Sequence, residues 1–190
     1  MIGITGIARS GKDTLGLSLL KMINKSSTKK AKIYSIANII KKDLNSLIKK
    51  QFGFSAFTED TNEKNLIRPI LVEYGEAMKT KYGENIWLDK LIENINFKKY
   101  IPIITDVRFD HEIKKLTKEH NAFIIHICRV GAEVPNELEK INDPKAKELS
   151  HIQYMWPTFG KNKLHLANDH TSILWQMVYP EYKEKWKTLN

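Results

Sequence analysis

A glycine-rich loop between an apolar strand and a helix constrains this chain more than any other feature. Residues 1–5, MIGIT, are typical of a short buried strand, and apolar residues recur at helical spacing after Lys12. Between the two lies GIARSGKDT, in which four residues separate Gly6 from Gly11 and Lys12 follows at once. This order predicts a phosphate-binding loop, whose backbone amides and helix N-terminus surround an anion. A glycine turn with a surface lysine is the alternative.

Asp13 departs from the usual pattern of such a loop, which has Ser or Thr directly after the lysine. Thr14 offers a hydroxyl one residue later. A carboxylate is favoured in the first turn of a helix, but beside a triphosphate it meets like charge unless a cation lies between them. We therefore predict that Asp13 faces Mg²⁺ or its waters. A carboxylate that only favours the helix end is the alternative.

Strand and helix patterns alternate along the chain. Apolar or β-branched segments that indicate strands are MIGIT, KIYSI (32–36), IPIITD (101–106), AFIIHIC (122–128) and KLHLAN (163–168). Helical spacing marks residues 12–23, 36–48, 87–95, 111–120 and 171–187, and Pro69 begins or bends a further helix. SAFTEDTNEKN (55–65) is typical of a loop. Alternation of this kind predicts one α/β domain with a parallel sheet covered on both faces.

Composition excludes several classes of protein. Cys128 is the only cysteine, so an intrachain disulfide is excluded, which suits a reducing cytoplasm. No apolar run approaches the length of a membrane helix, and the first residues lack the basic part of a signal peptide. The net charge of +9 suits an anionic partner, yet the basic residues are spread out and not interleaved with aromatic ones. We therefore interpret the charge as a lysine-rich surface and do not expect nucleic acid or a membrane as partner.

Charged residues follow two of the predicted strands. Asp106 ends IPIITD and Arg108 comes two residues later, while Arg129 ends the strand IIHICR. Because the carboxyl ends of parallel strands meet at one edge of a sheet, these side chains are expected near the loop. A carboxylate there suits Mg²⁺ or its waters, and an arginine suits phosphate. A turn aspartate and surface arginines are the alternatives.

The same segments carry a resemblance to a known family. GIARSGKDT, LIRPILVEYGEAMKTKYGENIWLDKLI, IITDVRFDHEI and HLANDHTSILWQMV resemble the deoxynucleoside monophosphate kinases of bacteriophages, which have the P-loop nucleoside monophosphate kinase fold. The resemblance implies a three-layer protein with a five-stranded parallel sheet, a helical monophosphate-binding insertion at about 36–85 and a lid at about 130–150. It also implies transfer of the γ-phosphoryl of ATP to a deoxynucleoside monophosphate with Mg²⁺, in a host cell cytoplasm.

The resemblance extends the set of candidate residues. It implies that Arg68 and Lys79 lie on the monophosphate side and that Asn168 and Asp169 lie near the adenine of ATP. Trp87 begins the helix that packs the insertion on the core, and we favour a core anchor for it over a substrate contact. Lys79 stands where arginine is common, and His170 replaces a usual glycine, so the contacts at these two positions stay open.

We expect the following site. The residues for catalysis are Arg9, Lys12, Asp13, Asp106, Arg108 and Arg129, with Asp13 and Asp106 near the metal. Those for ATP are Gly6, Ser10, Gly11, Lys12, Asp13, Thr14, Asn168 and Asp169, and those for the acceptor are Arg68, Lys79, Trp87 and Arg108.

Two alternatives to this function are kept. Phosphomevalonate kinases share a loop with Asp after Lys and have a similar length, so the acceptor could be a different small phosphate ester. A P-loop protein that binds nucleic acid without kinase activity is the alternative from another class. The expected partners are ATP and a deoxynucleoside monophosphate, and a homodimer is the one assembly considered.

Overall fold

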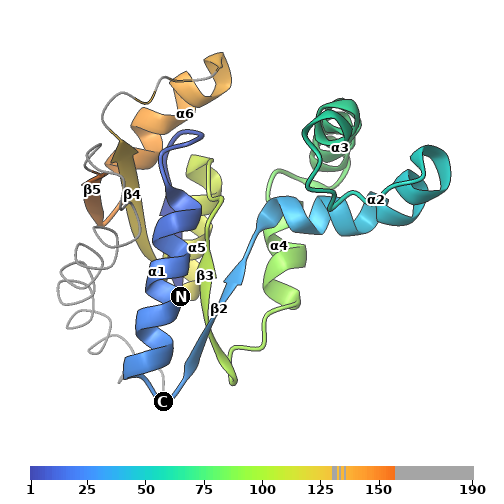
Figure 1. The fold of residues 1–190 in the computed structure, drawn as a ribbon. Coiled ribbons are helices and arrows are strands. Elements are labelled where there is room, and N and C mark those ends of the chain that lie inside the picture. Colours follow the sequence, from blue (N-terminus) through green and yellow to red (C-terminus); the bar gives the residue numbers. More distant parts are fainter. Residues whose placement is uncertain (130–131, 133, 135, 157–190) are drawn as a thin grey trace. The chain divides into compact units, whose positions relative to one another are not determined.

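The computed structural model describes residues 1–129, 132, 134 and 136–156. Within these residues the chain is α/β, with a five-stranded parallel sheet and six helices (Figure 1). The strands are β1 (Ile2–Thr5), β2 (Lys30–Tyr34), β3 (Tyr100–Ile104), β4 (Phe123–Arg129) and β5 (Ile152–Trp156). The helices are α1 (Lys12–Ser26), α2 (Ile36–Phe52), α3 (Thr61–Tyr82), α4 (Ile86–Glu93), α5 (Asp110–His120) and α6 (Glu137–Glu148). The predicted α/β class and the predicted five-stranded parallel sheet are confirmed.

The sheet has the order β2-β3-β1-β4-β5, and every neighbouring pair is parallel. From β1 the chain crosses to the β2 side of the sheet, whereas from β4 it crosses to β5 on the other side. Adjacent strands whose connections leave in opposite directions open a crevice at their carboxyl ends, where ligands bind in open α/β sheets. The segments that follow β1 and β4 therefore lie at the switch point of this sheet.

The core forms on both faces of the sheet because successive side chains of each strand point to opposite faces. Ile2 and Ile4 are fully buried against α1 residues such as Leu15 and Leu19. Gly3 points to the opposite face, where a Cβ would meet Ile124 and where Leu116 of α5 lies nearby. Strands buried on both faces have nearly continuous apolar sequences, which explains the runs in β1, β3 and β4.

The described chain divides into two compact units, one of residues 1–34 together with those from 96 onward, and one of residues 35–95. The second unit consists of α2, α3 and α4 and has its own apolar cluster, which includes Leu44, Ile48 and Ile67. It contains the range 36–85 expected for the insertion. Its proposed role in binding a monophosphate stays a prediction.

Three segments differ from the sequence-based expectations. Helix α3 begins at Thr61, inside the expected loop 55–65, because the Asp60 side chain accepts hydrogen bonds from the amides of Asn62 and Glu63. Pro69 lies within this helix. The expected lid contains helix α6, and the fifth strand of the described sheet is β5, which no pattern predicted. The expected strand 163–168 and helix 171–187 lie outside the described residues.

Candidate functional site

The loop after β1 has a backbone that most side chains would not tolerate. Gly6 has φ of +136°, and a Cβ there would lie 2.3 Å from the carbonyl oxygen of Ile127 in β4. Gly11 has φ of +100° and occupies the N-cap position of α1, and Arg9 also has a positive φ of 63°. Glycine alone adopts such conformations at no steric cost. The two glycines are thus required by the turn that leads from β1 into α1.

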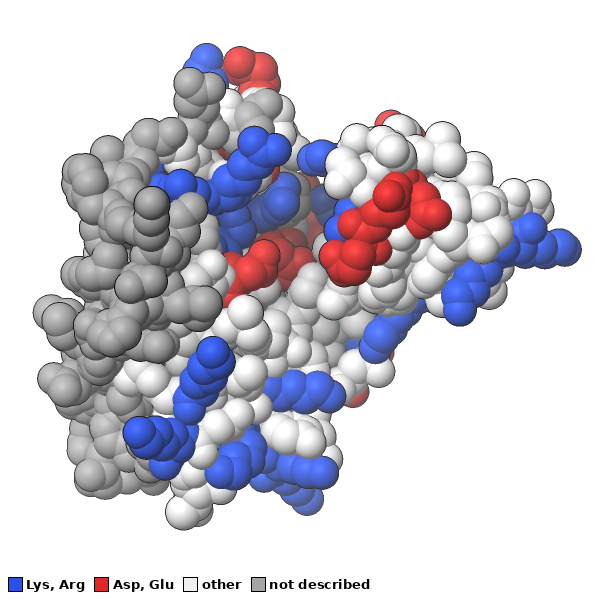
Figure 2. Space-filling view, viewed as in Figure 1, with Lys and Arg blue, Asp and Glu red and all other residues white. Residues whose placement is uncertain are grey.

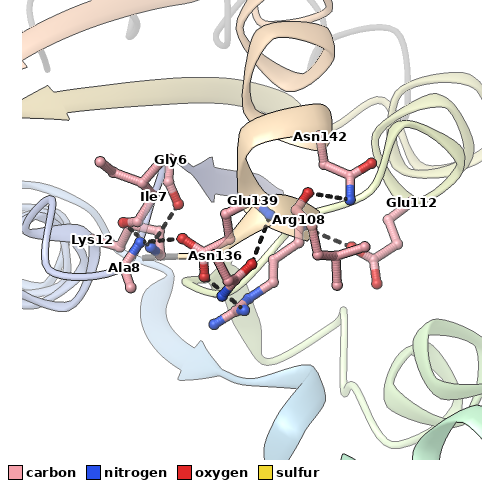
Figure 3. Close-up of polar contacts among 10 residues, drawn as sticks. Gly6, Ile7, Ala8, Lys12, Arg108, Glu112, Asn136, Glu139 and Asn142 are labelled. Carbon is pink, nitrogen blue, oxygen red and sulfur yellow. Dashed lines mark hydrogen bonds and ion pairs between the residues drawn. The ribbon is translucent and has the colours of Figure 1, made fainter. Parts of the chain in front are cut away.

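Lys12 lies at the first position of α1 and folds back over the loop. Its Nζ donates hydrogen bonds to the carbonyl oxygens of Gly6 and Ile7, each at 2.7 Å (Figure 3). Burial lowers the pKa of Lys12, and the neighbouring Arg108 lowers it further, while Glu139, Asp13 and Asp106 act in the opposite direction. The structure therefore brings the predicted residues Lys12, Asp13, Asp106 and Arg108 into one electrostatic neighbourhood.

A pocket opens at this edge of the sheet. Its lining comes from the end of β1 and the loop, from the segment before α5, and from α6, namely Thr5, Gly6, Ile7, Arg108, Phe109, Leu138, Glu139, Asn142 and Asp143.

Ser10 is fully buried, and its Oγ has no hydrogen-bond partner among the described residues. An orphaned hydroxyl in the loop is a group that a bound ligand or water can satisfy.

Arg108 is held at the pocket by α5. The buried carboxylate of Glu112 accepts hydrogen bonds from the amides of Arg108 and Phe109 at 2.8 and 3.0 Å. These contacts fix the backbone that leads into α5, since they satisfy the amides of the N-cap residue Phe109 and of Arg108 before it. The guanidinium of Arg108 donates to the Glu139 carboxylate at 3.1 Å. Arg129, at the end of β4, donates to the carbonyl oxygen of Arg9 at 3.4 Å.

Two acidic residues here, Glu112 and Glu139, were not predicted from the sequence. Glu112 has a local signal, because a glutamate three residues after a helix start often returns to the backbone amides before it. Glu139 has no such signal. It comes from α6, far along the chain, and only the fold brings its carboxylate to the loop, where it accepts from the Ala8 amide at 2.6 Å.

The residues predicted for the acceptor other than Arg108 belong to the second unit. Arg68 is exposed on α3, and Lys79 is ion-paired with Glu76 at 2.8 Å. Trp87 is buried and donates from its indole nitrogen to the carbonyl oxygen of Gly75 at 3.0 Å, which is the environment of a core anchor. Asn168 and Asp169, predicted for the adenine, lie outside the described residues.

A magnesium ion fits the donors near the loop. Among the described residues no group of three or more His, Cys, Asp or Glu side chains forms a ready metal site. Mg²⁺ is usually held by one or two carboxylates together with substrate phosphates and waters, so a full protein cage is not required. Asp13 and Asp106, both close enough to act on the pKa of Lys12, supply that number of carboxylates.

Two surface findings bear on partners. In the part of the chain that the structure describes, no helix is both long and apolar enough to span a membrane. On the face drawn in Figure 2, the lysine and arginine side chains form several separate groups. The interpretation of the charge as a lysine-rich surface stays a prediction.

Part of the chain matches a known protein family. The family described as phosphomevalonate kinase matches residues 4–122, which include the loop, the second unit and the Asp106–Arg108 segment. No curated protein matches the chain. The match supports a kinase, and it favours the phosphomevalonate kinase alternative over the bacteriophage family that the sequence segments resemble.

Proposed function

Since the chain belongs to the phosphomevalonate kinase family, a family of phosphotransferases, we propose that it transfers the γ-phosphoryl group of ATP to a phosphate group of a small molecule. The observation that carries this proposal is the loop between β1 and α1. Its amides, Lys12 and Arg108 meet at the switch point of the sheet, where a phosphate chain has donors on several sides.

Phosphoryl transfer requires the protein to position the two phosphates and to offset their negative charge. An oxygen of the acceptor phosphate attacks the γ-phosphorus, the bond to the β–γ bridging oxygen breaks, and ADP leaves with the electron pair. The acceptor is already ionised, so no strong general base is needed. Lys12, Arg9, Arg108 and Arg129 are proposed to orient the two phosphates and to offset the charge that repels them.

Asp13 and Asp106 are proposed to hold Mg²⁺, directly or through water. An ion held by these two carboxylates would supply positive charge that offsets the charge of the transferred phosphoryl group. Ser10 and Thr14 are proposed to contact the phosphates, together with the amides between Gly6 and Gly11. Segment 130–150, with α6, is proposed as the lid that excludes water from the reaction. Asn168 and Asp169 remain proposed for the adenine.

The acceptor has two candidates. The matched family favours phosphomevalonate, whose single phosphate and carboxylate need cationic side chains and no base pocket. A deoxynucleoside monophosphate is the second candidate, because the resemblance to the bacteriophage kinases includes residues 165–178, beyond the family match. For either acceptor we propose Arg68 and Lys79 as contacts, with Trp87 contributing through packing.

A panel of acceptors tests the proposal. Purified protein is incubated with ATP, Mg²⁺ and, in turn, phosphomevalonate, dTMP, dGMP, dCMP or AMP, and the phosphorylated product is measured directly. Lys12→Ala protein from the same preparation scheme controls for contaminating kinases. Turnover of phosphomevalonate alone supports the first acceptor, and turnover of a nucleotide supports the second. The proposed function is contradicted if none of these acceptors is phosphorylated, whether ATP is hydrolysed or left intact.

A further inference from the structure

The carboxylate of Glu139 occupies the phosphate-binding loop. Its Oε2 accepts a hydrogen bond from the amide of Ala8 at 2.6 Å, and its Oε1 accepts from the guanidinium of Arg108 at 3.1 Å (Figure 3). The side chain is only 11% exposed. An anion held by a loop amide and an arginine has the environment that a phosphate group would have in this loop.

Helix α6 fixes this position from its first turn. The Asn136 side chain accepts from the amide of Glu139 at 2.9 Å and begins the helix. The next turn of α6 places Asn142 and Asp143 along the same pocket, which also includes Thr5 and Gly6. Glu139 therefore reaches the loop from a well-formed helix end.

The contact competes with a ligand phosphate for the same donors. The single N–H of Ala8 cannot donate a full hydrogen bond to Glu139 and to a phosphate oxygen at once, and Arg108 is drawn to the same carboxylate. Lys12 is also turned inward, with its Nζ on the carbonyl oxygens of Gly6 and Ile7. In this arrangement the Ala8 amide, Arg108 and Lys12 are all engaged within the protein.

We propose that Glu139 is an internal substitute for phosphate, which must leave the loop before the phosphates of ATP can bind. The inference rests on the proposed phosphate-binding function of the loop. Release of Glu139 frees the Ala8 amide and Arg108 and detaches the first turn of α6. Only molecules in which Glu139 has left the loop can bind nucleotide, so the apparent affinity for nucleotide falls as the Glu139-bound state becomes more populated. Nucleotide binding is thereby linked to movement of α6.

The test compares the dissociation constants of wild-type protein and three variants for ATP and for inorganic tripolyphosphate, measured calorimetrically without metal. Glu139→Gln removes the charge that holds the side chain in the loop. If the Glu139-bound state outweighs the open state by about ten to one in wild type, loss of that state tightens binding of ATP and tripolyphosphate about tenfold. Glu139→Asp keeps the charge but is too short to hold both partners, and should also tighten binding. Glu137→Gln is the matched control, since Glu137 is 83% exposed and pairs only distantly with Lys140, at 3.5 Å.

The variants separate occupation of the loop from a general charge effect. If Glu139→Asp binds like wild type while Glu139→Gln binds more tightly, charge alone is responsible and the inference is wrong. Equal or weaker binding by Glu139→Gln, with an unchanged melting temperature, also overturns it. If wild type and all variants bind neither ATP nor tripolyphosphate, the proposed function fails and the inference with it, whereas equal binding by all refutes the inference alone.

Discussion

At the scale of single residues, Lys12 does two things in this structure. Its Nζ bonds to two carbonyl oxygens of the loop, and it stands among the charges of Arg108, Glu139, Asp13 and Asp106. The first set of contacts holds the loop closed on itself. A phosphate chain would rearrange this first set, since Lys12 can exchange carbonyl oxygens for phosphate oxygens as partners.

Lys12→Ala is expected to abolish phosphoryl transfer while the protein stays folded. The variant loses a cation that is proposed to contact the transferred group. Its two lost hydrogen bonds come from a charged donor and are each worth about 1.5–3 kcal/mol of stability, which removal of the partly desolvated ammonium offsets in part. Turnover with the best acceptor of the panel and the melting temperature are the two measurements. Turnover near that of wild type would show that the loop does not bind the phosphates of ATP.

Asp13→Asn tests whether this carboxylate serves the metal or only the helix. The substitution keeps size and hydrogen bonding but removes the charge. We expect kcat to fall by about 10²–10³, the scale of one charge interaction lost in the transition state. ATP affinity without metal should be unchanged or slightly higher, and kcat is measured against Mg²⁺ concentration. Near-normal kcat with a slightly lower melting temperature would leave Asp13 as a helix-end residue.

The sequence predicted the loop but not the residues that close it. Gly6, Gly11 and Lys12 are neighbours in the chain, so their geometry is local and their pattern is visible. Glu139 meets Ala8 across 131 positions, and no local pattern encodes such a contact. Arg108 lies between these cases, because its place after a buried strand was predictable while its partner was not.

At the scale of elements, α3 and α4 are joined by Trp87 within the second unit. The indole is 2% exposed, donates to the carbonyl oxygen of Gly75 at 3.0 Å, and packs against Tyr74 with ring centroids 5.6 Å apart. Lys90 lies over the ring at 4.9 Å. A single side chain thus provides apolar burial, a hydrogen bond and two ring contacts to this helical unit.

Trp87→Phe is expected to destabilise the protein by about 2–3 kcal/mol, from the lost hydrogen bond and the cavity left by the smaller ring. Urea denaturation followed by circular dichroism measures the change. The control is Tyr82→Phe, which removes a hydroxyl from an exposed aromatic side chain at the end of α3 and should cost little. If Trp87→Phe is as stable as wild type but raises KM for the acceptor, Trp87 contacts substrate and is not a core anchor.

The element boundaries show what local patterns miss. Helical spacing was visible over residues 36–48, and α2 continues to Phe52, where Gly53 ends it in a left-handed conformation. The start of α3 depended on the side chain of Asp60, which the polar composition of the segment concealed. Pro144 lies within α6, so a proline in the range expected for the lid does not prevent a helix there. Strand β5 pairs with β4 from Ile152 on, in a segment without clear alternation.

At the scale of the whole molecule, the fold buries a histidine beside the site. His126 of β4 pairs in register with Thr5, the last residue of β1 before the loop, and its side chain is 1% exposed. Neither ring nitrogen has a hydrogen-bond partner among the described residues, and Asp143 of α6 lies 3.7 Å from Nε2. Burial above all, then the charges of Lys147 and Lys12, lowers the pKa of His126 from 6.5 to about 4.

The lowered pKa of His126 leads to a prediction of how the free energy of unfolding depends on pH. Its folded-state pKa is below the unfolded value, so its contribution is fully present above pH 6.5 and is lost as pH falls toward 4, because the unfolded chain takes up the proton first. The free energy of unfolding should fall by about 3 kcal/mol from this group as the pH reaches 4. His126→Phe removes the titrating group, so the difference between wild-type and variant free energies of unfolding isolates it from the carboxylates. Urea denaturation at pH values stepped from neutral down to about 4, the folded-state pKa, measures this difference. Wild type should lose stability relative to the variant between pH 6.5 and 4, and parallel curves would mean that His126 keeps an ordinary pKa in the folded protein.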